Sequence, residues 1–351
     1  MSSPGVPAGR IPRLDALRDS LLDAERIALT THVNADGDGT GSQGAVAAWL
    51  TRSGRTVCIA NPTPFPATFR HLIEDPAWIV DTATEAGAEA LRSAQLLLVL
   101  DTGEPARIGR IATIFRGRPH AVLDHHLPSE NGFEGVIVQD DSACATGELV
   151  YDLLLRAGFP RPWPPTICEA LYTAILTDTG SFRFSNTSPR AHGIAADLLA
   201  QGVDPEAVYR RIHGNVPLAR VRLLRHALDH LETDDTMPIT WIGIERGIME
   251  ELGTTTDDLE GILEHARSVQ GTEVALLFRE MLDGSTKVSL RSTGRANVNA
   301  IARQFGGGGH EKASGALIGQ PMHEVRPRVL EATRNQLRDL GLHFRTGDEA
   351  G

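Results

Sequence analysis

Short, uninterrupted runs of apolar residues alternate with helical patterns through the first half of the chain. The sequence predicts buried strands at Ile27–Thr31, Thr56–Ala60, Leu96–Leu100 and Ala121–Leu123, and a helix over Gly41–Arg52. Strands that are apolar on both faces and are separated by helices are typical of a parallel sheet covered on both sides. Ligands of such sheets bind at the carboxyl ends of the strands. The polar residues that follow each strand are therefore candidates for a functional site.

The second half of the chain follows a different pattern. The residues from Ser188 to Leu231 are mostly helical in pattern, and a polar break follows at Thr233–Pro238. We predict two α/β domains, the second smaller than the first: a catalytic domain at 1–188, a helical linker at 189–238 and a second domain at 239–345. Strands of the second domain are predicted at Ile239–Ile244, Glu273–Glu280 and Lys287–Ser292. One helical face is formed by Val298, Ile301, Ala302 and Phe305.

Charge and cysteine content narrow the class of protein. The formal net charge of −11 argues against a protein that grips long duplex DNA through a basic face, although bound metal ions can still attract a small anion. Cys58, Cys144 and Cys168 are isolated, so no pair has zinc-knuckle spacing, and their isolation argues against a disulfide framework. Residues 1–10 lack the apolar core of a signal peptide, and Leu96–Leu100 is too short to span a bilayer. We expect a soluble cytoplasmic protein with a polar tail after His343.

A glycine-rich segment with one histidine and two aspartates follows the first predicted strand. His32, Asp36 and Asp38 lie in a turn that opens a helix, so the two carboxylates can face adjacent cations. An Asx-rich turn with an N-cap explains this segment equally well when it is taken alone. The segment lacks the ligand spacing and the terminal glutamate of an EF-hand.

Acidic and imidazole side chains also end the later elements. Asp101 ends the third strand, Asp124, His125 and His126 end the fourth, and Asp178 ends a predicted helix. Taken separately, each aspartate could be a helix-capping residue and each histidine a solvated imidazole. That explanation would require the same coincidence at the end of every strand. Carboxylate and imidazole ligands without thiolate favour manganese or a similar ion over structural zinc. Such a set suits two ions roughly 3.5–4 Å apart, a pair that activates water and neutralises a phosphoryl group.

The ordered set of motifs resembles the DHH phosphoesterase family. The residues that carry the resemblance are His32-x-x-x-Asp36-x-Asp38, Asp101, Asp124-His125-His126, Asp178, Arg291-Ser292, Gly306–His310, Ala313 and Gly315. The last four resemble the DHH-associated domain of that family. The similarity covers roughly Leu14 to Leu340 and is greatest to the bacterial oligoribonuclease and pAp-phosphatase (nanoRNase) branch. The ordered set is highly specific, whereas each motif alone is only moderately so.

The resemblance implies how the first domain would bind metal. His32, Asp36 and Asp101 would hold the first ion. Asp38, Asp101, His125 and Asp178 would hold the second ion, with Asp101 bridging the pair. His126 would stabilise charge on the scissile phosphate, and Asp124 would orient its neighbours. The ions would be Mn²⁺, with Mg²⁺ or Co²⁺ as alternatives.

The resemblance also implies a nucleotide-binding role for the second domain. Arg291 and Ser292, the loop of Gly307, Gly308 and Gly309, and His310 would bind the terminal nucleotide across a cleft from the metals. Without the neighbouring motif, Arg291 reads as an ordinary exposed arginine and the glycines as a flexible linker. Three family positions differ: Ala35 replaces proline, Thr40 replaces an aliphatic residue, and Cys144-Ala145 precedes Thr146. None of these is a ligand position.

The expected activity is hydrolysis of short oligonucleotides from the 3′ end, of linear dinucleotides such as pApA, or of pAp, to nucleoside 5′-monophosphates. Three other functions are compatible with parts of this pattern. A manganese inorganic pyrophosphatase would carry a Ser-Arg-Lys-Lys patch that is not found. A RecJ-type single-strand DNA exonuclease would need a further OB-type domain. A nucleotide-binding sensor without catalysis would be expected to have lost ligands. A homodimer through the first domain is implied by the resemblance only.

Overall fold

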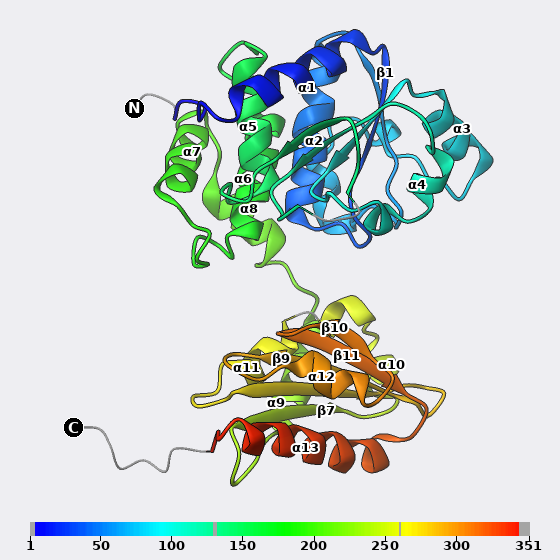
Figure 1. Ribbon diagram of the computed structural model, residues 1–351, viewed down its shortest axis with the longest axis vertical. Helices are drawn as coiled ribbons and strands as arrows, with labels where there is room; N and C mark the ends of the chain where they lie inside the picture. The colour runs from blue at the N-terminus through cyan, green and yellow to red at the C-terminus, as the bar shows by residue number, and fades with distance from the viewer. Residues whose placement is uncertain (1–3, 129–131, 260, 344–351) are drawn as a thin grey trace. The chain divides into compact units, whose positions relative to one another are not determined.

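The computed structural model describes residues 4–128, 132–259 and 261–343, which form two compact units (Figure 1). The first unit comprises Met1–Asn215 and the second Val216–Gly351. The segment 189–238, predicted as a linker, is divided between them. It supplies α7 (Pro189–Ala200) and α8 (Pro205–Ile212) to the first unit, and α9 (Leu218–Asp229) and β6 (Leu231–Thr233) to the second. The polar tail predicted after His343 lies outside the described residues.

A five-stranded parallel sheet forms the centre of the first unit, as the apolar runs predicted. Its strand order is β2-β1-β3-β4-β5. The strands are β1 (Arg26–Thr30), β2 (Thr56–Ile59), β3 (Leu96–Leu100), β4 (His120–Asp124) and β5 (Val136–Gln139). Strand β5 was not predicted, because only three apolar residues mark it and it lies at the edge of the sheet.

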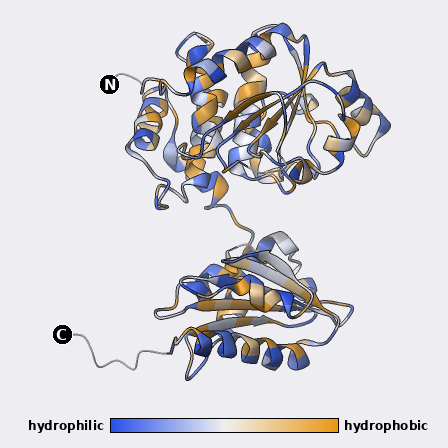
Figure 2. Ribbon diagram, viewed as in Figure 1, coloured by the Kyte–Doolittle hydropathy of each residue, from blue (hydrophilic) through white to orange (hydrophobic). Residues whose placement is uncertain are grey.

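Helices cover both faces of this sheet. They are α1 (Ile11–Asp23), α2 (Gly37–Arg52), α3 (Glu85–Ser93), α4 (Arg110–Ile114), α5 (Thr146–Arg156) and α6 (Pro165–Asp178), with short 3₁₀ turns η1 (Ala67–Leu72), η2 (Pro76–Trp78) and η3 (Pro105–Ile108). Alternate residues of each strand enter opposite cores: Leu98 and Leu100 face one, and Leu97 and Val99 face the other. The central residues of these strands are accordingly hydrophobic (Figure 2).

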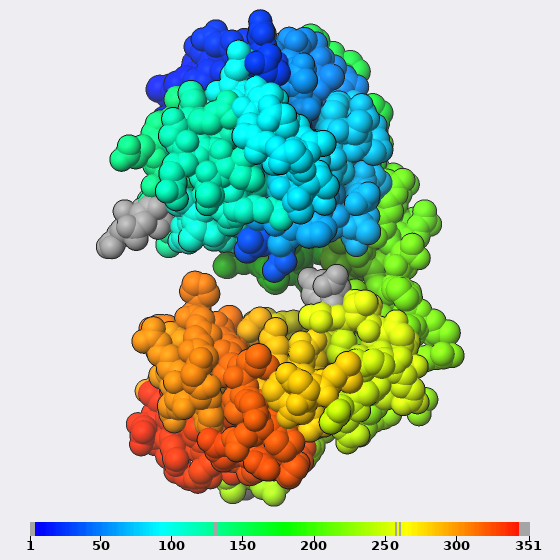
Figure 3. Space-filling model, turned by 90° about the vertical axis from the view of Figure 1, so that its right-hand side faces the viewer, coloured from blue at the N-terminus to red at the C-terminus, as the bar shows by residue number. Residues whose placement is uncertain are grey.

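Helix α2 is buried along almost its whole length, between the sheet and α6. Glycines make this close packing feasible: a Cβ on Gly41 would lie 2.4 Å from the carbonyl oxygen of Ala170 in α6, and one on Gly44 would lie 2.6 Å from that of Leu72. The start of α2 therefore has little freedom to move. The segment between β2 and β4 covers the side of the first unit seen in Figure 3, in light blue to green.

The second unit is built on a six-stranded mixed sheet of order β10-β11-β9-β8-β7-β6, in which only β7 and β8 pair in parallel. The further strands are β7 (Ile239–Ile244), β8 (Val274–Glu280), β9 (Thr286–Ser292), β10 (Gly308–His310) and β11 (Ala313–Ile318). The remaining helices are α10 (Ile248–Leu252), η4 (Thr256–Leu259), α11 (Ile262–Arg267), α12 (Val298–Arg303) and α13 (Met322–Asp339). Helices α12 and α13 pack on one face, and α9 and α11 on the other.

The glycine run of the second unit is partly a strand rather than a loop. Gly308–His310 forms β10, which pairs with β11. A Cβ on Gly307 would lie 2.2 Å from the carbonyl oxygen of Gly315, and Gly309 has a φ of +139°. The fold of the second unit therefore requires glycine at these two positions, because a side chain would clash there. Gly308, in contrast, has open space beside its Cα. Among the described residues, the helices are all too short or too polar to cross a lipid bilayer.

Candidate metal centre

The parallel sheet gathers the predicted ligands at one edge. His32 follows β1, Asp101 follows β3, and Asp124 and His125 end β4. Strands β1, β3 and β4 are adjacent, so their carboxyl ends meet although they are far apart in sequence. Three groups of side chains there have ligand atoms within 4.8 Å of one another: His32, Asp36 and Asp101; Asp38, His125 and Asp178; and Asp101, His125 and His126.

The first group is centred on His32. Its Nε2 atom lies 3.6 Å from Oδ2 of Asp36 and 3.4 Å from Oδ2 of Asp101. Nδ1 of His32 donates to the carbonyl oxygen of Val33 at 2.8 Å, so Nε2 is the nitrogen that faces the carboxylates. Burial alone would lower the pKa of His32, but the carboxylates of Asp101 and Asp36 raise it to about 10. The position between these side chains therefore favours a cation strongly.

The second group is centred on His125. Its Nε2 atom lies 3.7 Å from Oδ2 of Asp38, 3.5 Å from Oδ1 of Asp101 and 3.5 Å from Oδ2 of Asp178. This nitrogen is buried and has no hydrogen-bond partner. An unpaired buried polar atom is costly, and a metal ion would satisfy it. Asp101 faces one group through Oδ2 and the other through Oδ1, which is the geometry of a bridging carboxylate.

Asp101 adopts a backbone conformation that is rare outside glycine. Its φ is +62°, and its side chain is only 2 % exposed. Its amide nitrogen donates to the carbonyl oxygen of Leu123 at 3.0 Å, which fixes the turn against β4. The N-cap of the following η3 is Glu104, so Asp101 does not serve as a cap. Left-handed non-glycine residues cluster at functional sites, where the surrounding structure holds them.

Asp36 divides its two oxygens between two tasks. Oδ1 accepts hydrogen bonds from the amides of Asp38 and Gly39, at 3.0 and 3.1 Å, as the N-cap of α2. Oδ2 is the oxygen that faces His32. The capping and the metal-binding interpretations of this segment are therefore compatible, because a carboxylate has an oxygen for each.

Charge repulsion shows what kind of ligand the cluster fits. Burial and the neighbouring carboxylates raise the pKa of Asp38 well above its usual range. Burial, opposed in part by His125, raises the pKa of Asp178 to about 6. Divalent cations would relieve this repulsion. Burial raises the pKa of the nearby Cys144 thiol strongly, so it offers no thiolate. The donors are carboxylate and imidazole groups, which fit Mn²⁺ or a similar ion.

His126 is oriented by Asp124. Asp124 is fully buried, and its Oδ1 accepts hydrogen bonds from Nδ1 of His126 at 2.7 Å and from its amide at 3.1 Å. Gln139 donates to the other oxygen at 2.9 Å. The hydrogen bond that His126 donates to Asp124 raises the pKa of His126, against the opposing effects of burial and the Arg107 guanidinium. The His126 side chain is 43 % exposed, so its imidazole can meet a substrate.

Three residues that contact this cluster were not assigned a role from sequence. Thr146 and Gly147, at the start of α5, hydrogen-bond Asp38, and Thr146 also bonds Asp101. Asn186 donates to Asp178. None of these three residues directly follows a strand, so the strand-end pattern that identified the predicted ligands could not identify them. For Thr146 and Gly147, the one local indication of such a role was the short Thr-Gly sequence that opens an apolar helix.

In the second unit, the predicted nucleotide-binding residues come together around β11. Arg291 and His310 both pair in register with Ala313, from opposite sides, so the three side chains share one face of the sheet. Arg291 is half-buried and His310 is exposed. Ser292 lies on the other face, buried among neighbours, and its hydroxyl has no hydrogen-bond partner. Arg291 and His310 are thus placed to share a ligand, whereas Ser292 is not exposed to one on that face.

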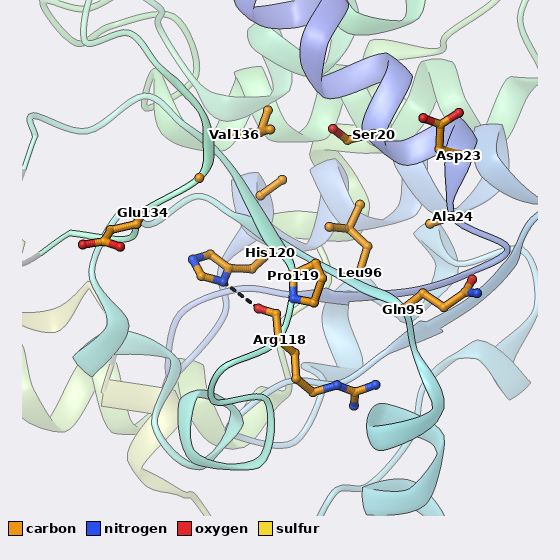
Figure 4. Close-up of a pocket in the computed structure, with 12 residues that line it drawn as sticks. Ser20, Asp23, Ala24, Gln95, Leu96, Arg118, Pro119, His120, Glu134 and Val136 are labelled. Atoms are coloured by element: carbon orange, nitrogen blue, oxygen red, sulfur yellow. Dashed lines mark hydrogen bonds between the residues drawn. The ribbon is translucent and has the colours of Figure 1, made fainter.

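A cavity of about 670 Å³ lies at the opposite end of the first sheet (Figure 4). It is lined by the residues at the amino ends of β3, β4 and β5 together with the end of α1. His120 donates through Nδ1 to the carbonyl oxygen of Arg118 at 3.0 Å, and its buried Nε2 has no partner. The cavity contains none of the predicted ligands and is separate from the metal centre.

Comparison with known proteins agrees with this architecture. Residues 26–175 match the model of the DHH family, N-terminal domain, and residues 240–339 match the DHHA1 domain. A bifunctional oligoribonuclease and PAP phosphatase NrnA from Thermus thermophilus is 32% identical over 321 residues, covering 90% of this chain and 91% of the relative.

Solved structures share the fold. An exopolyphosphatase-related protein from Bacteroides fragilis superposes with a TM-score of 0.82 at 24% identity, over 93% of this chain and 96% of that one. RecJ from Thermus thermophilus in complex with Mn²⁺ matches with a TM-score of 0.51 at 15% identity, over 95% of this chain and 56% of that one. With its ordered motifs, its two matched domains and this close relative, the chain belongs to the DHH family of phosphoesterases.

Proposed function

We propose that this protein is a two-metal phosphoesterase that hydrolyses short oligonucleotides, linear dinucleotides or pAp to nucleoside 5′-monophosphates. One observation carries the proposal: the two oxygens of Asp101 face two separate groups of ligands. In the proposed site, His32, Asp36 and Asp101 would hold one ion, and Asp38, Asp101, His125 and Asp178 would hold the other. Manganese is the ion we favour, and RecJ, which shares the fold, has been solved with Mn²⁺.

The chain supplies orientation and charge around these ions. When bound, the ions activate water and neutralise the phosphoryl oxygens. Asp124 holds the His126 imidazole with Nδ1 protonated, so that Nε2 is the nitrogen that faces the substrate. A protonated His126 stabilises the charge that builds on the phosphoryl group. The raised pKa of His126 favours that protonated form.

The second unit supplies recognition of the nucleotide. Arg291 offers a planar guanidinium that fits a phosphate in a bidentate manner. His310 lies on the same face of the sheet, and Gly308, in the same strand β10 as His310, leaves the backbone accessible. We assign these three residues to the grip on the terminal nucleotide. The Thermus thermophilus relative is named for activity on oligoribonucleotides and PAP, which supports this choice of substrate class.

Experiments can distinguish this function from two others, a RecJ-type exonuclease and a nucleotide sensor. A RecJ-type exonuclease would degrade long single-stranded DNA, and a sensor would bind nucleotides without turnover. The intact set of metal ligands in the first unit favours an enzyme over a sensor. We expect the protein to act in the cytoplasm, where its three unpaired cysteines stay reduced.

The test is a substrate panel with Mn²⁺: pAp, pApA, a short RNA oligomer, a long single-stranded DNA and pyrophosphate. The proposal predicts turnover of the first three, with nucleoside 5′-monophosphates as products. Preference for the long DNA would favour the exonuclease, preference for pyrophosphate would favour a pyrophosphatase, and no turnover would favour the sensor. Gel filtration with light scattering would show whether the protein is a dimer.

A further inference from the structure

The first turn of α5 contacts two of the proposed metal ligands directly. The amides of Thr146 and Gly147 donate to Oδ2 and Oδ1 of Asp38, at 2.7 and 2.8 Å. The hydroxyl of Thr146 donates to Oδ1 of Asp101 at 3.1 Å. Thr146, Asp38 and Asp101 are all buried. One threonine therefore reaches a ligand of the second ion through its backbone and the bridging ligand through its side chain.

This turn is held in place by contacts that are independent of the ligands. The amide of Cys144 donates to Oε2 of Glu148 at 3.1 Å, and the buried guanidinium of Arg10 binds Oε1 of Glu148 at 2.6 Å. Asn186 donates to the carbonyl oxygen of Cys144 at 2.9 Å and to Oδ2 of Asp178 at 3.4 Å. The segment 144–148 is thus fixed against the N-terminal segment and is connected to a third ligand.

Gly147 makes the close approach feasible. A Cβ at this position would lie 2.5 Å from Cβ of Ala174 in α6, which is too close for two carbon atoms that are not bonded to each other. Any larger residue would push the start of α5 away from Asp38. The position of Thr146 is therefore set by packing on both sides, as expected of a group that must orient another with accuracy.

The hydroxyl of Thr146 decides how the Asp101 carboxylate is used. An aspartate side chain can rotate and exchange its two oxygens, but here the Thr146 hydroxyl donates to Oδ1, while Oδ2 faces Nε2 of His32 at 3.4 Å. Oδ1 is the oxygen that faces His125 in the second group, 3.5 Å away. The hydrogen bond occupies one lone pair of Oδ1 and leaves the other directed toward the second group.

We propose that Thr146 is a positioning residue that fixes the bridging carboxylate of Asp101, and that its hydroxyl is needed for tight binding of the second metal ion. The inference rests on the proposed two-metal function and extends it. Loss of an outer hydrogen-bond partner of a metal ligand weakens metal binding by roughly 10- to 100-fold. We expect weaker binding of only one of the two ions. The proposed ligands Asp36 and His32 of the first ion make no contact with Thr146 among the described residues.

The test compares Thr146→Val, which keeps shape and removes the hydroxyl, with Thr146→Ser, which keeps the hydroxyl. Mn²⁺ is titrated into the full-length apoprotein and followed by calorimetry, and electron paramagnetic resonance reports spin coupling between the two ions. The matched control is Thr173→Val, because Thr173 is a buried threonine of the neighbouring α6 whose hydroxyl has no partner. Melting of each apoprotein shows that it is folded.

The wild type and the Thr173→Val variant should bind two ions and show the coupled signal. Thr146→Val should bind one ion as before and the second about 10- to 100-fold more weakly, with loss of coupling at equal Mn²⁺, and Thr146→Ser should restore both. Unchanged binding of both ions by Thr146→Val would overturn the inference, as would equal impairment of Thr146→Ser. A wild type that binds fewer than two ions would instead overturn the proposed function, which separates the two failures.

Discussion

Nδ1 of His126 lies 2.7 Å from Oδ1 of the fully buried Asp124, and the amide of His126 donates to the same oxygen. The second oxygen of Asp124 accepts from Gln139, so the carboxylate is held from both sides. A short hydrogen bond between an imidazole and a carboxylate fixes the ring and determines which nitrogen is presented outward. In this site, that nitrogen is Nε2. Asp124 therefore holds the imidazole of His126 in one orientation.

Replacing Asp124 with Asn should lower kcat without unfolding the protein. The amide retains the shape of the carboxylate but loses the negative charge that favours a protonated His126, and we expect a loss of about 10- to 100-fold. The measurement is steady-state hydrolysis of pApA with Mn²⁺, and Asp141→Asn is a control on an exposed neighbour. A wild-type kcat in Asp124→Asn would show that the contact has no role in turnover.

Replacing Asp101 with Ala should remove Mn²⁺-dependent hydrolysis almost completely. The proposed bridging ligand serves both ions, so its loss should exceed the roughly 100-fold upper range seen for outer partners of a metal ligand. Wild-type protein treated with a chelator should show the same residual rate, and added Mn²⁺ should restore only the wild type. Turnover by Asp101→Ala near the wild-type value would refute the bridging role.

Replacing Arg291 with Ala should impair nucleotide substrates much more than a small generic phosphodiester. A charge-assisted phosphate contact contributes about 1.5–3 kcal/mol, which corresponds to about 10- to 100-fold in kcat/KM. Lys287→Ala is the matched control, because Lys287 lies on the same face of β9 and is exposed. The two variants are compared on pAp and on bis-p-nitrophenyl phosphate. An equal loss of kcat/KM on both substrates would contradict the assignment of Arg291 to nucleotide binding.

The second unit should lose stability in acid through Asp234. Burial alone would raise the pKa of Asp234, but the amide of Thr236 and the guanidinium of Arg334 outweigh it, and the pKa falls below 3.8. The ionised form therefore stabilises the folded state at every pH above about 3.8, and this contribution is lost as the pH falls through the lowered pKa. Asp234→Asn lacks the contribution throughout.

Thermal unfolding of the wild type and of Asp234→Asn tests this. The difference in melting temperature should be constant between about pH 5 and pH 7 and should shrink below about pH 4. Arg334→Gln should behave in a similar manner, because Nε of Arg334 lies 2.7 Å from Oδ2 of Asp234. A difference that grows with acidity would have the wrong sign for a carboxylate with a lowered pKa.

Replacing Gly41 with Ala should destabilise the first unit, although the same change usually stabilises a helix. Alanine gains up to about 1 kcal/mol over glycine in a helix interior. Here a Cβ would lie 2.4 Å from the carbonyl oxygen of Ala170 and 3.2 Å from Cβ of Ala174. Overpacking of this kind costs about 1–3 kcal/mol, so packing should outweigh propensity. Urea unfolding measures the net change, and an increase in stability would show that α2 and α6 can separate easily.

Four of the five strands of the first unit and the chemical types of its candidate ligands could be predicted from local sequence. The all-apolar run Leu96–Leu100 is a buried central strand, and the acidic and imidazole residues at the ends of β1, β3 and β4 follow from the same pattern. Buried parallel strands need apolar side chains on both faces, and their carboxyl ends must meet, so local sequence carries this information.

The tertiary structure alone decided the contacts between distant segments. The role of Thr146 depends on how closely α5 approaches α2 and α6, and the reason for Gly307 and Gly309 depends on β11. No local pattern encodes these distances, because they result from the packing of separate elements against one another in the folded core. Strand composition thus fixed which residues could bind metal, and side-chain packing fixed which neighbours orient them.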